Sequence, residues 1–467
     1  MRARVEQIVG ATKGRLVRGD GAQEVQGVST DTRSIQAGQL FIALEGPNFD
    51  GNEFALKASA SRPGALLLRD GHSAVPGIVE RLPEDSAVVL HPAPRKALSE
   101  LASWHRGRLD VPVIGITGSC GKTTTKNVLV HLLSETHRVV GSPNSFNNDI
   151  GVPHTLFLAD DSTEALVVEI GTNAPGEIAA LCRTARPTGA IITNIGAAHL
   201  EGLGSVEGVA KEKGDLAAKV DAEGFCVLNA NCAWTPAIRE RTEAEVITFS
   251  VEGDGDLDAR DLYTHGAGTT FRVEGHEVTS PLVGAHNVEN LLAALAACKG
   301  MGLELADVLP LVSGVRTARG RMERIELEGL TVLDDSYNAN PSSAMASVRV
   351  LCGMHGHGRR VLVLGEMLEL GVHSDPAHKA IGGEAAASGV DIIVCVGELA
   401  RATAAGALEA GLGGECVHHF ETAEEVVAAS DQLFQEEDVV LVKGSRRVGL
   451  ERLVRHFSER HEAGGAS

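Results

Sequence analysis

A chain of 467 residues is long enough for about three domains, because single domains usually hold roughly 100–200 residues. Hydrophobic residues make up 43% of the chain but aromatic residues only 3%, and such aliphatic cores suit parallel sheets covered by helices. The net charge of −20 argues against non-specific nucleic-acid binding, which requires clustered Lys and Arg. A single pocket can still be basic enough for a phosphorylated ligand. The acidic balance has an equally good explanation in solubility.

The eight cysteines indicate reduced thiols. They include no CxxC pair, and several lie in apolar runs such as DIIVCVG, which favours a reducing compartment over a disulfide framework or a zinc site. The first residues, MRARVEQIVGATKGR, lack the apolar core of a signal peptide. No apolar stretch approaches the ~18 residues of a membrane helix. We therefore expect a cytoplasmic protein without a membrane span.

Residues 1–105 are predicted to form a small mixed α/β domain. The apolar runs QLFIALEG, GALLLRD and SAVVLHP predict strands, and GPNFDGNEF has the composition of a turn-rich loop. The segment PRKALSELASWHRG predicts a helix that ends near Gly107, at the expected domain boundary.

Residues 106–316 repeat a strand–loop–helix rhythm. The runs VPVIGI, EALVVEI, GAIITNI and FCVLNA predict strands, and the helical segments between them favour a parallel sheet with right-handed crossovers. HNVENLLAALAACKGMG predicts a late helix, on which Leu291, Leu292 and Leu295 share a face and Gly300 offers a stop.

Residues 317–467 show the same rhythm in LTVLDDS, RRVLVLGEM, DIIVCVGEL and DVVLVKGS. This alternation with Ala-rich helices predicts a smaller, Rossmann-like domain. The predicted fold class is therefore α/β, with a small mixed N-terminal domain, a central parallel-sheet domain that carries a P-loop, and a C-terminal Rossmann-like domain.

The strongest local signal is GITGSCGKTTTK, in which an apolar strand leads into a glycine-containing loop and then a helix. Backbone N–H groups of such a loop, together with the helix N-terminus, cradle phosphates. We expect Lys122 to reach the β- and γ-phosphates and the Thr123 hydroxyl to bind Mg²⁺. Ile116 stands where the strict pattern GxxxxGK[ST] needs its first glycine, but Gly118 and Gly121 remain. The alternative is a loop with a structural role alone.

Two further polar side chains follow predicted strands. Glu169 ends the run EALVVE, and ligands of open α/β sheets lie at this edge, where a carboxylate can complete Mg²⁺ coordination. It could instead cap the next turn. His199 follows GAIITNI and would approach the same edge, although a lone histidine is more often structural. Lys211 and Lys213 in VEGVAKEKGDL lie on a predicted helix, and lysines there usually face solvent.

Two more groups are open to either a functional or a structural interpretation. Ser29, Thr30, Asp31 and Arg33 in VSTDTR could bind the phosphates and uracil of a nucleotide sugar or simply form a turn. Near the C-terminus, polar side chains again follow predicted strands.

In that C-terminal part, Arg321 of GRMERIE could reach a phosphate, and Asp335 is placed for a ribose hydroxyl. The composition of the following YNANPSS supports a plain Asx-rich turn equally well. Lys443 and Arg446 beside the last strand could hold a carboxylate.

In their order along the chain, these motifs resemble those of the Mur ligases of peptidoglycan synthesis. The resemblance covers essentially the whole chain, through STDTR, FIALEGPNFDGNEF, GITGSCGKTTTK, NSFNNDIGVP, EIG, TNIGAAHLEGLGS, AKEKGDL, GAHNVENLLAA, GRMER, DDSYNANPSS and GEMLELG. Each motif is moderately specific, and the ordered set is highly specific. DDSYNANP and GEMLELG match the branch that adds D-alanyl-D-alanine to UDP-N-acetylmuramoyl-tripeptide. The DNPR-type motif of the diaminopimelate-adding branch does not occur.

The resemblance implies a role for each matching residue. The nucleotide contacts would be Gly118, Ser119, Cys120, Gly121, Lys122, Thr123, Thr124, Asn287, Asn290, Arg321 and Asp335. The metal ligands would be Thr123, Glu169, His199 and Lys213, and the catalytic residues Lys122, Lys213, His199 and Arg321. The substrate contacts would be Ser29, Thr30, Asp31, Arg33, Asp50, Gly51, Asn52, Asn338 and Lys443.

At three of these matches, the site needs a special condition or the sequence differs from the common family pattern. The family uses a carbamylated lysine as a metal ligand, and the match falls on Lys213 rather than Lys211; an ordinary lysine pKa of ~10.4 leaves little free amine for CO₂, so the site must lower it. Many relatives carry His where this chain has Asn52. The pair Ser119-Cys120 replaces the commoner Thr-Asn, where backbone groups do most of the cradling.

The implied reaction uses ATP with two Mg²⁺ ions. The terminal carboxylate of the tripeptide attacks the γ-phosphate, giving an acyl phosphate and ADP, and the amine of D-alanyl-D-alanine then displaces phosphate. The expected partners are these substrates alone, bound by a monomer, and the third residue of the tripeptide is left open between diaminopimelate and lysine. One alternative is a folylpolyglutamate synthase of the same fold, against which STDTR and FIALEGPNFDGNEF argue. Another is a nucleotide-binding switch, which only the P-loop supports.

Overall fold

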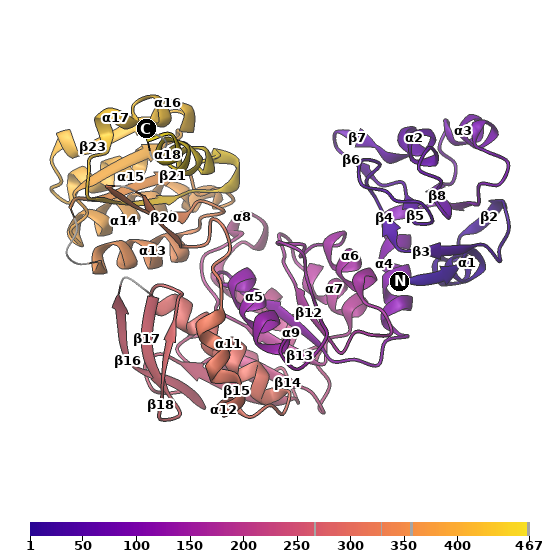
Figure 1. The fold of residues 1–467 in the computed structure, drawn as a ribbon, viewed down its shortest axis with the longest axis horizontal. Helices are drawn as coiled ribbons and strands as arrows, with labels where there is room; N and C mark the ends of the chain where they lie inside the picture. The colour runs from indigo at the N-terminus through magenta and orange to yellow at the C-terminus, as the bar shows by residue number, and fades with distance from the viewer. Residues whose placement is uncertain (266–267, 328, 355–357, 465–467) are drawn as a thin grey trace.

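The computed structural model describes residues 1–265, 268–327, 329–354 and 358–464, and it has the expected three α/β regions in chain order. Figure 1 shows the N-terminal region in indigo to purple on one side, the central region in purple through magenta to salmon, and the C-terminal region in orange and yellow on the other side. The predicted α/β fold class is confirmed. The limits 1–105, 106–316 and 317–467 stay a prediction.

The N-terminal region is built on a mixed sheet with strand order β2-β9-β8-β5-β4, in which only the β2–β9 pair is antiparallel. Its elements are β1 (Arg2–Arg4), α1 (Val5–Thr12), β2 (Arg15–Arg18), β3 (Glu24–Gln26), β4 (Val28–Ser29), β5 (Leu40–Ile42), β6 (Glu45–Gly46), β7 (Phe49–Asp50), α2 (Ala55–Ser59), β8 (Ala65–Arg69), α3 (Val75–Arg81), β9 (Val88–His91) and α4 (Pro94–Arg106). The three predicted strands are β5, β8 and β9, and the predicted loop GPNFDGNEF contains the short hairpin β6–β7.

Helix α4 joins the N-terminal and central regions through one hydrophobic core. Its residues Ala97, Leu98 and Leu101 are completely buried in a cluster that also holds Leu156 and Ile178 of the central region. Helix α4 therefore packs against both the N-terminal and the central region, and the expected boundary near Gly107 comes directly after it.

The central region is organised around a long sheet with strand order β11-β12-β10-β13-β14-β15-β16-β17-β18. Its elements are β10 (Val113–Thr117), α5 (Lys122–Leu133), β11 (Val139–Gly141), α6 (Gly151–Leu158), β12 (Ala165–Glu169), α7 (Glu177–Ala185), β13 (Gly189–Ile192), α8 (Leu200–Leu203), α9 (Val206–Ala217), β14 (Phe225–Asn229), α10 (Thr235–Arg239), β15 (Glu245–Ser250), β16 (Leu257–His265), β17 (Gly268–Val273), β18 (His276–Ser280), α11 (Ala285–Gly300) and α12 (Leu305–Val308).

The central sheet is parallel, as predicted, and an antiparallel hairpin extends it at one end. Strands β10 to β16 pair in parallel, but β16, β17 and β18 form antiparallel pairs. The turn between β17 and β18 has positive φ at Glu274 (46°) and Gly275 (82°), which suits a tight hairpin. The sequence TTFRVEGHEVTS carries this hairpin signal, since two alternating runs flank a glycine-containing turn.

The predicted late helix, α11, is confirmed, and it is buried on more than the one face that a helix at the surface of a sheet would bury. Leu291, Leu292 and Leu295 are all completely buried, and the helix ends at Gly300 as predicted. It packs against β14, β15 and α5, the helix that follows the phosphate loop.

The C-terminal region has the strand order β19-β20-β24-β21-β22-β23, which is parallel except for the β19–β20 edge pair. Its elements are β19 (Glu323–Leu327), β20 (Leu330–Asp335), α13 (Pro341–Gly353), β21 (Arg360–Gly365), α14 (Ser374–Ala387), β22 (Ile392–Val396), α15 (Arg401–Glu409), β23 (Val417–Phe420), α16 (Ala423–Ala428), α17 (Ser430–Leu433), β24 (Asp438–Lys443) and α18 (Glu451–Gly464). The four predicted strands are β20, β21, β22 and β24.

Two global expectations can be compared with the described residues. Within those ranges no helix has the length and apolar character needed to cross a bilayer. All eight cysteines fall inside the described ranges, and each is a free thiol, as expected.

Candidate active site

A cleft of about 570 Å³ lies between the central and C-terminal regions. The carboxyl ends of β10, β12 and β13 reach it from one side, and those of β20 and β24 from the other. Ligands of open α/β sheets bind at this edge of the strands. Both sheets therefore direct their binding edge into a single cleft.

The loop between β10 and α5 has a backbone that only glycine can supply at two positions. Gly118 has φ 152° and a Cβ there would meet Thr193 Oγ1 at 1.9 Å, while Gly121 has φ 82° and its Cβ would meet Asn290 Oδ1 at 2.0 Å. Since β10 lies between β12 and β13, the loop emerges beside the ends of both strands. The two glycines thus let the loop pack against its neighbours and leave its N–H groups near the cleft.

Helix α5 begins at Lys122, directly after this loop. Lys122 Nζ donates a hydrogen bond to the Gly118 carbonyl at 2.7 Å, so the ammonium group is held over the loop. Burial lowers the pKa of Lys122, and the nearby charge of Glu169 opposes that shift. A lysine in this position places a positive charge where phosphates would bind.

Thr123 and Glu169 meet beside the loop, as predicted. The Thr123 hydroxyl donates to Glu169 Oε2 at 2.9 Å, and Asn147 Nδ2 donates to Glu169 Oε1 at 2.8 Å. Glu169 is only 1% exposed, and hydroxyl and carboxylate oxygens are the ligands that Mg²⁺ prefers. The donor set therefore fits a magnesium ion.

His199 reaches the same cleft and is oriented by the C-terminal region. Its Nδ1 lies 2.6 Å from Glu369 Oε2, and both residues have positive φ, 54° and 64°. Pairing through Nδ1 leaves Nε2 as the ring nitrogen available to a ligand. The contact with His199 lowers the pKa of Glu369, so the carboxylate stays ionised.

Lys213 on α9 is fully buried, with an exposed fraction of 0%. Its Nζ has no hydrogen-bond partner among the residues that the structure describes. Burial, reinforced by the positive charge of Lys122, lowers the pKa of Lys213 well below its ordinary value. Lys211, two positions earlier, is exposed, because residues two apart point to different sides of a helix.

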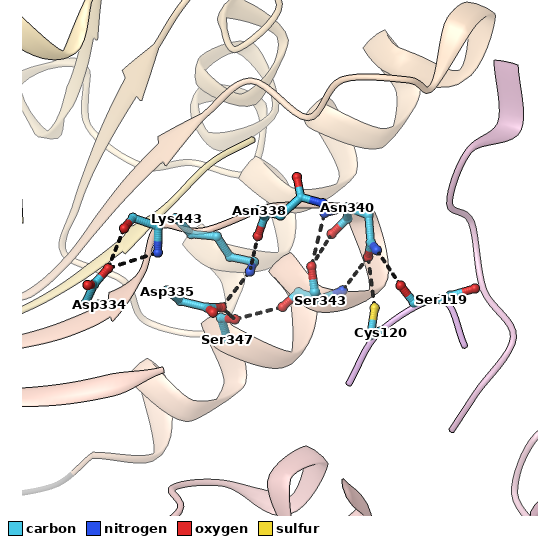
Figure 2. Close-up of polar contacts among 10 residues, drawn as sticks. Ser119, Cys120, Asp334, Asp335, Asn338, Asn340, Ser343, Ser347 and Lys443 are labelled. Carbon is cyan, nitrogen blue, oxygen red and sulfur yellow. Dashed lines mark hydrogen bonds and ion pairs between the residues drawn. The ribbon is translucent and has the colours of Figure 1, made fainter. Parts of the chain in front are cut away.

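The C-terminal wall of the cleft is built on the ends of β20 and β24. Lys443 Nζ lies 2.5 Å from Asp335 Oδ2 and 3.1 Å from the Asn338 carbonyl oxygen, and the Ser347 hydroxyl donates to Asp335 at 2.6 Å (Figure 2). Asp335 and Lys443 therefore form a buried pair, although the sequence suggested separate roles in nucleotide and substrate binding. The Asn338 residue itself is exposed.

Arg321 and two asparagines complete the cleft. The Arg321 Nη2 donates to Thr123 Oγ1 at 3.3 Å, and its guanidinium lies 4.1 Å from the centre of the Tyr337 ring. Asn290 Nδ2 donates to Asn287 Oδ1 at 3.2 Å, so these two side chains support each other on α11. Ten of the eleven predicted nucleotide contacts line the cleft: Ser119, Cys120, Gly121, Lys122, Thr123, Thr124, Asn287, Asn290, Arg321 and Asp335. The eleventh, Gly118, is not among the lining residues, but its carbonyl accepts the hydrogen bond of Lys122.

Comparison with known proteins accounts for this arrangement. Residues 116–298 match the Mur ligase middle domain, and residues 320–446 match the Mur ligase, glutamate ligase domain. The chain is 34% identical to the UDP-N-acetylmuramoyl-tripeptide–D-alanyl-D-alanine ligase of Bacillus subtilis, covering 97% of this chain and 98% of that one. It is 36% identical to the Escherichia coli protein of the same name, covering 92% and 93%.

The chain belongs to the Mur ligase family.

A solved structure of a member of this family has the same architecture. The crystal structure of MurF from Acinetobacter baumannii superposes with a TM-score of 0.88 at 29% identity, covering 98% of this chain and 99% of that one. The three-region α/β fold predicted from the sequence is therefore that of a Mur ligase.

The motif STDTR of this Mur ligase lies at the junction between the N-terminal sheet and α6. The Thr30 hydroxyl lies 3.1 Å from His154 Nε2 of α6, and Ser29 Oγ donates to the Asp31 carbonyl. Arg33 pairs with Asp31 through two N–H groups, and this hydrogen bonding lowers the pKa of Asp31 to about 2. This group of residues, called the STDTR patch below, therefore presents an exposed, fully charged pair of side chains.

The second N-terminal group, Asp50 to Asn52, is more enclosed. Asn52 is completely buried: its Nδ2 donates to Asp50 Oδ1 at 2.8 Å, and its Oδ1 accepts from the Arg69 backbone N–H at 2.9 Å. Asp50 also lies 2.7 Å from His72 Nε2. A Cβ at Gly51 would meet the Leu44 carbonyl oxygen at 2.5 Å. Asn52 thus supports the loop, and Asp50 is the partly exposed residue of this group.

Several cleft residues were not singled out from the sequence. Asn194 accepts from the Cys120 N–H, and Glu369 holds His199, although each stands in a motif that carries the family resemblance. Burial lowers the pKa of His286 to about 4 and raises that of Glu289 to about 6. The strand-end position of Asn194, directly after GAIIT, was the one local signal that could have identified it.

Proposed function

We propose that this chain is an ATP-dependent ligase that joins D-alanyl-D-alanine to UDP-N-acetylmuramoyl-tripeptide. The observation that carries the proposal is a cleft that combines a P-loop lysine with a buried Thr–Glu pair, in a chain whose curated relatives bear this name over more than nine-tenths of their length. Beside the cleft lies the buried Lys213, which has no hydrogen-bond partner among the described residues and whose pKa the charge of Lys122 helps to lower. We further propose that the enzyme acts as a monomer in the cytoplasm.

The reaction would proceed in two steps. A carboxylate oxygen of the tripeptide forms a bond to the γ-phosphorus of ATP while the bond to the β,γ-bridging oxygen breaks, which yields an acyl phosphate and ADP. The amine of D-alanyl-D-alanine then forms a bond to the acyl carbon, phosphate leaves, and a base accepts the amine proton. Such phosphoryl transfer depends mainly on positioning and charge neutralisation.

The cleft supplies that neutralisation from two sides. Lys122 is fixed over the phosphate loop by its bond to the Gly118 carbonyl, and Arg321 approaches Thr123 from the C-terminal region. Magnesium ions bound by Thr123, Glu169, His199 and Lys213 would supply further positive charge to the phosphate oxygens. Closure of a cleft between two regions excludes water, which would otherwise hydrolyse an acyl phosphate.

Lys213 is proposed to act as a carbamate. A carbamate forms when the neutral amine bonds to the carbon of CO₂ and releases a proton, and its two oxygens are anionic like those of a carboxylate. Two observations support this role: Nζ is buried without a partner among the described residues, and burial lowers its pKa, which favours the neutral amine.

The N-terminal region is proposed to bind the UDP-sugar. Ser29, Thr30, Asp31 and Arg33 lie together between its sheet and α6, and Arg33 is largely exposed, so its guanidinium can bind phosphate. Figure 1 places this region across the central domain from the C-terminal one. A long substrate can therefore extend from the sugar site toward the cleft.

The test is ATP-dependent phosphate release by the purified protein, with and without each substrate, and with mass analysis of the product. We expect release only when UDP-N-acetylmuramoyl-tripeptide and D-alanyl-D-alanine are both present, and a pentapeptide product. Parallel assays with diaminopimelate- and lysine-containing tripeptides give the preferred third residue. Stimulation by a folate substrate, or tight ATP binding without stimulation by either proposed substrate, would contradict the proposal.

A further inference from the structure

Asn340 connects the C-terminal region to the phosphate loop of the central region. Its Nδ2 donates to the Ser119 carbonyl oxygen at 3.3 Å, and its Oδ1 accepts from the Cys120 thiol at 3.2 Å (Figure 2). These contacts join residues more than 200 positions apart, since Asn340 lies 221 residues after Ser119. Asn340 is therefore one point at which the C-terminal region touches the loop that would hold the phosphates, in addition to the contact of Arg321 with Thr123.

The contacts act on one peptide group. The Ser119 carbonyl and the Cys120 N–H belong to the same planar peptide, on opposite sides of the chain. The carbonyl accepts from Asn340, and the N–H donates to Asn194 Oδ1 at 2.9 Å. This peptide of the phosphate loop is consequently fixed at both ends by asparagines, one from each region.

Asn340 is itself held rigidly. It is the N-cap of α13, where Oδ1 accepts from the Ser343 N–H at 2.9 Å and the Asn340 N–H donates to the Ser343 hydroxyl at 3.1 Å. Pro341 occupies the first turn and suits a helix start. Beyond the cap, Ser347 donates to the Asp335 carboxylate, so the contact leads back to the buried ion pair of the cleft wall.

We propose that Asn340 is a positioning residue that orients the Ser119–Cys120 peptide of the phosphate loop, with the Cys120 thiol as its second contact. The loop then reaches its ATP-binding conformation only while the C-terminal region is docked. The inference rests on the proposed function, because it assumes that ATP binds at this cleft.

The decisive variant is Asn340→Ser. Serine caps helices about as well as asparagine, but its side chain is too short to keep the contacts with the loop. We expect a roughly three- to tenfold rise in the KM for ATP and in the Kd of a non-hydrolysable ATP analogue with Mg²⁺, matching the net value of lost hydrogen bonds. The unfolding midpoint and the KM for D-alanyl-D-alanine should stay close to those of the wild type.

Coupling to the thiol is tested with Cys120→Ala. Because a thiol is a weak donor, we expect the KM for ATP and the Kd of the ATP analogue to rise about twofold. In the double variant with Asn340→Ser, both constants should rise by less than the product of the two single effects. Maleimide labelling followed by peptide mass analysis gives an independent readout. Cys120 should react several-fold faster in Asn340→Ser, whereas the partly exposed Cys416, which lies away from the cleft, should not change.

Wild-type ATP affinity and wild-type Cys120 labelling in a folded Asn340→Ser protein would overturn the inference. If that variant unfolds early, Asn340→Asp decides, because it keeps the cap and replaces the Nδ2 donor with an oxygen that repels the Ser119 carbonyl; unchanged affinity there would likewise overturn it. Failure of the wild type to bind the analogue would instead contradict the proposed function.

Discussion

The nucleotide cleft and the STDTR patch both concentrate charged side chains, but they hold them differently. In the cleft, Lys443 pairs with Asp335 across 108 residues of sequence, and the side chains are only 2% and 13% exposed. In the patch, Arg33 pairs with Asp31 two positions away, and the side chains are 83% and 39% exposed. One pair depends on the folding of a whole domain and the other on a single turn.

The difference has a physical consequence for binding. A buried charge needs a partner at all times, because the surrounding protein screens it poorly, so the cleft keeps its geometry without ligand. An exposed pair is weak and screened by solvent, so Arg33 can exchange Asp31 for a phosphate at little cost. We therefore expect a preorganised nucleotide cleft and an adaptable sugar patch.

The largest effect is expected at Lys213. Lys213→Ala removes the proposed carbamate and should lower kcat on the order of 10³-fold, since a metal ion contributes several kcal/mol of charge stabilisation. The matched control is Lys211→Ala on the exposed side of α9, which should retain wild-type activity. Steady-state phosphate release measures both, and added short carboxylates should partly restore the Lys213 variant. Carbon-13-labelled CO₂ should give a carbamate NMR signal in the wild type and in Lys211→Ala, but not in Lys213→Ala. Near-wild-type activity of Lys213→Ala without a carboxylate would contradict the role.

The second effect concerns stability. Lys443→Met leaves the Asp335 carboxylate buried with the Ser347 hydroxyl as its remaining side-chain donor, and we expect a loss of about 3 kcal/mol in the free energy of unfolding. Lys379→Met, which removes the exposed Lys379–Glu409 pair of the same domain, should cost about 0–1 kcal/mol. Urea denaturation compares them. Equal losses would show that burial does not distinguish the two pairs.

Acid should weaken the interface between the N-terminal and central regions. His105 on α4 lies 3.0 Å from the Ala159 carbonyl oxygen, and burial lowers its pKa from 6.5 to about 4. Because the folded pKa lies below the unfolded one, stability is complete above about pH 6.5 and falls as the pH decreases toward 4. The expected loss is on the order of 2 kcal/mol, allowing for partial solvation. Denaturation across this pH range should show a shallower decline for His105→Gln, and identical slopes would refute the assignment.

The smallest effect is expected in the patch. Arg33→Ala should raise the KM for UDP-N-acetylmuramoyl-tripeptide about tenfold, the value of one charge-assisted hydrogen bond, and leave the KM for ATP unchanged. Arg15→Ala, at the exposed Arg15–Asp70 pair of the same region, serves as the control and should change neither constant. A rise in the KM for ATP in Arg33→Ala would mean that the two sites are not separate.

Local sequence patterns determined most of the fold. Apolar runs that alternate with helical segments identified the strands that end at the cleft. The glycines before Lys122 identified the loop between β10 and α5. Both signals are local, because hydrophobic periodicity and the backbone freedom of glycine are visible within a few residues. The same reasoning missed the hairpin β17–β18, whose alternating runs are partly polar and lie at the edge of an otherwise parallel sheet. Periodicity does not state which strands become neighbours.

Tertiary structure alone decided how the side chains are paired. It buried Lys213 and exposed Lys211, joined Asp335 to Lys443, brought Glu369 to His199, and placed Asn340 against the phosphate loop. The last two of these contacts join the central and C-terminal regions, and the Asp335–Lys443 pair joins two strands of the C-terminal region. The sequence by itself determined which residue types stand at the ends of the strands. The docking of the two sheets determined which of them meet, because a contact distance depends on how whole domains pack and not on spacing along the chain.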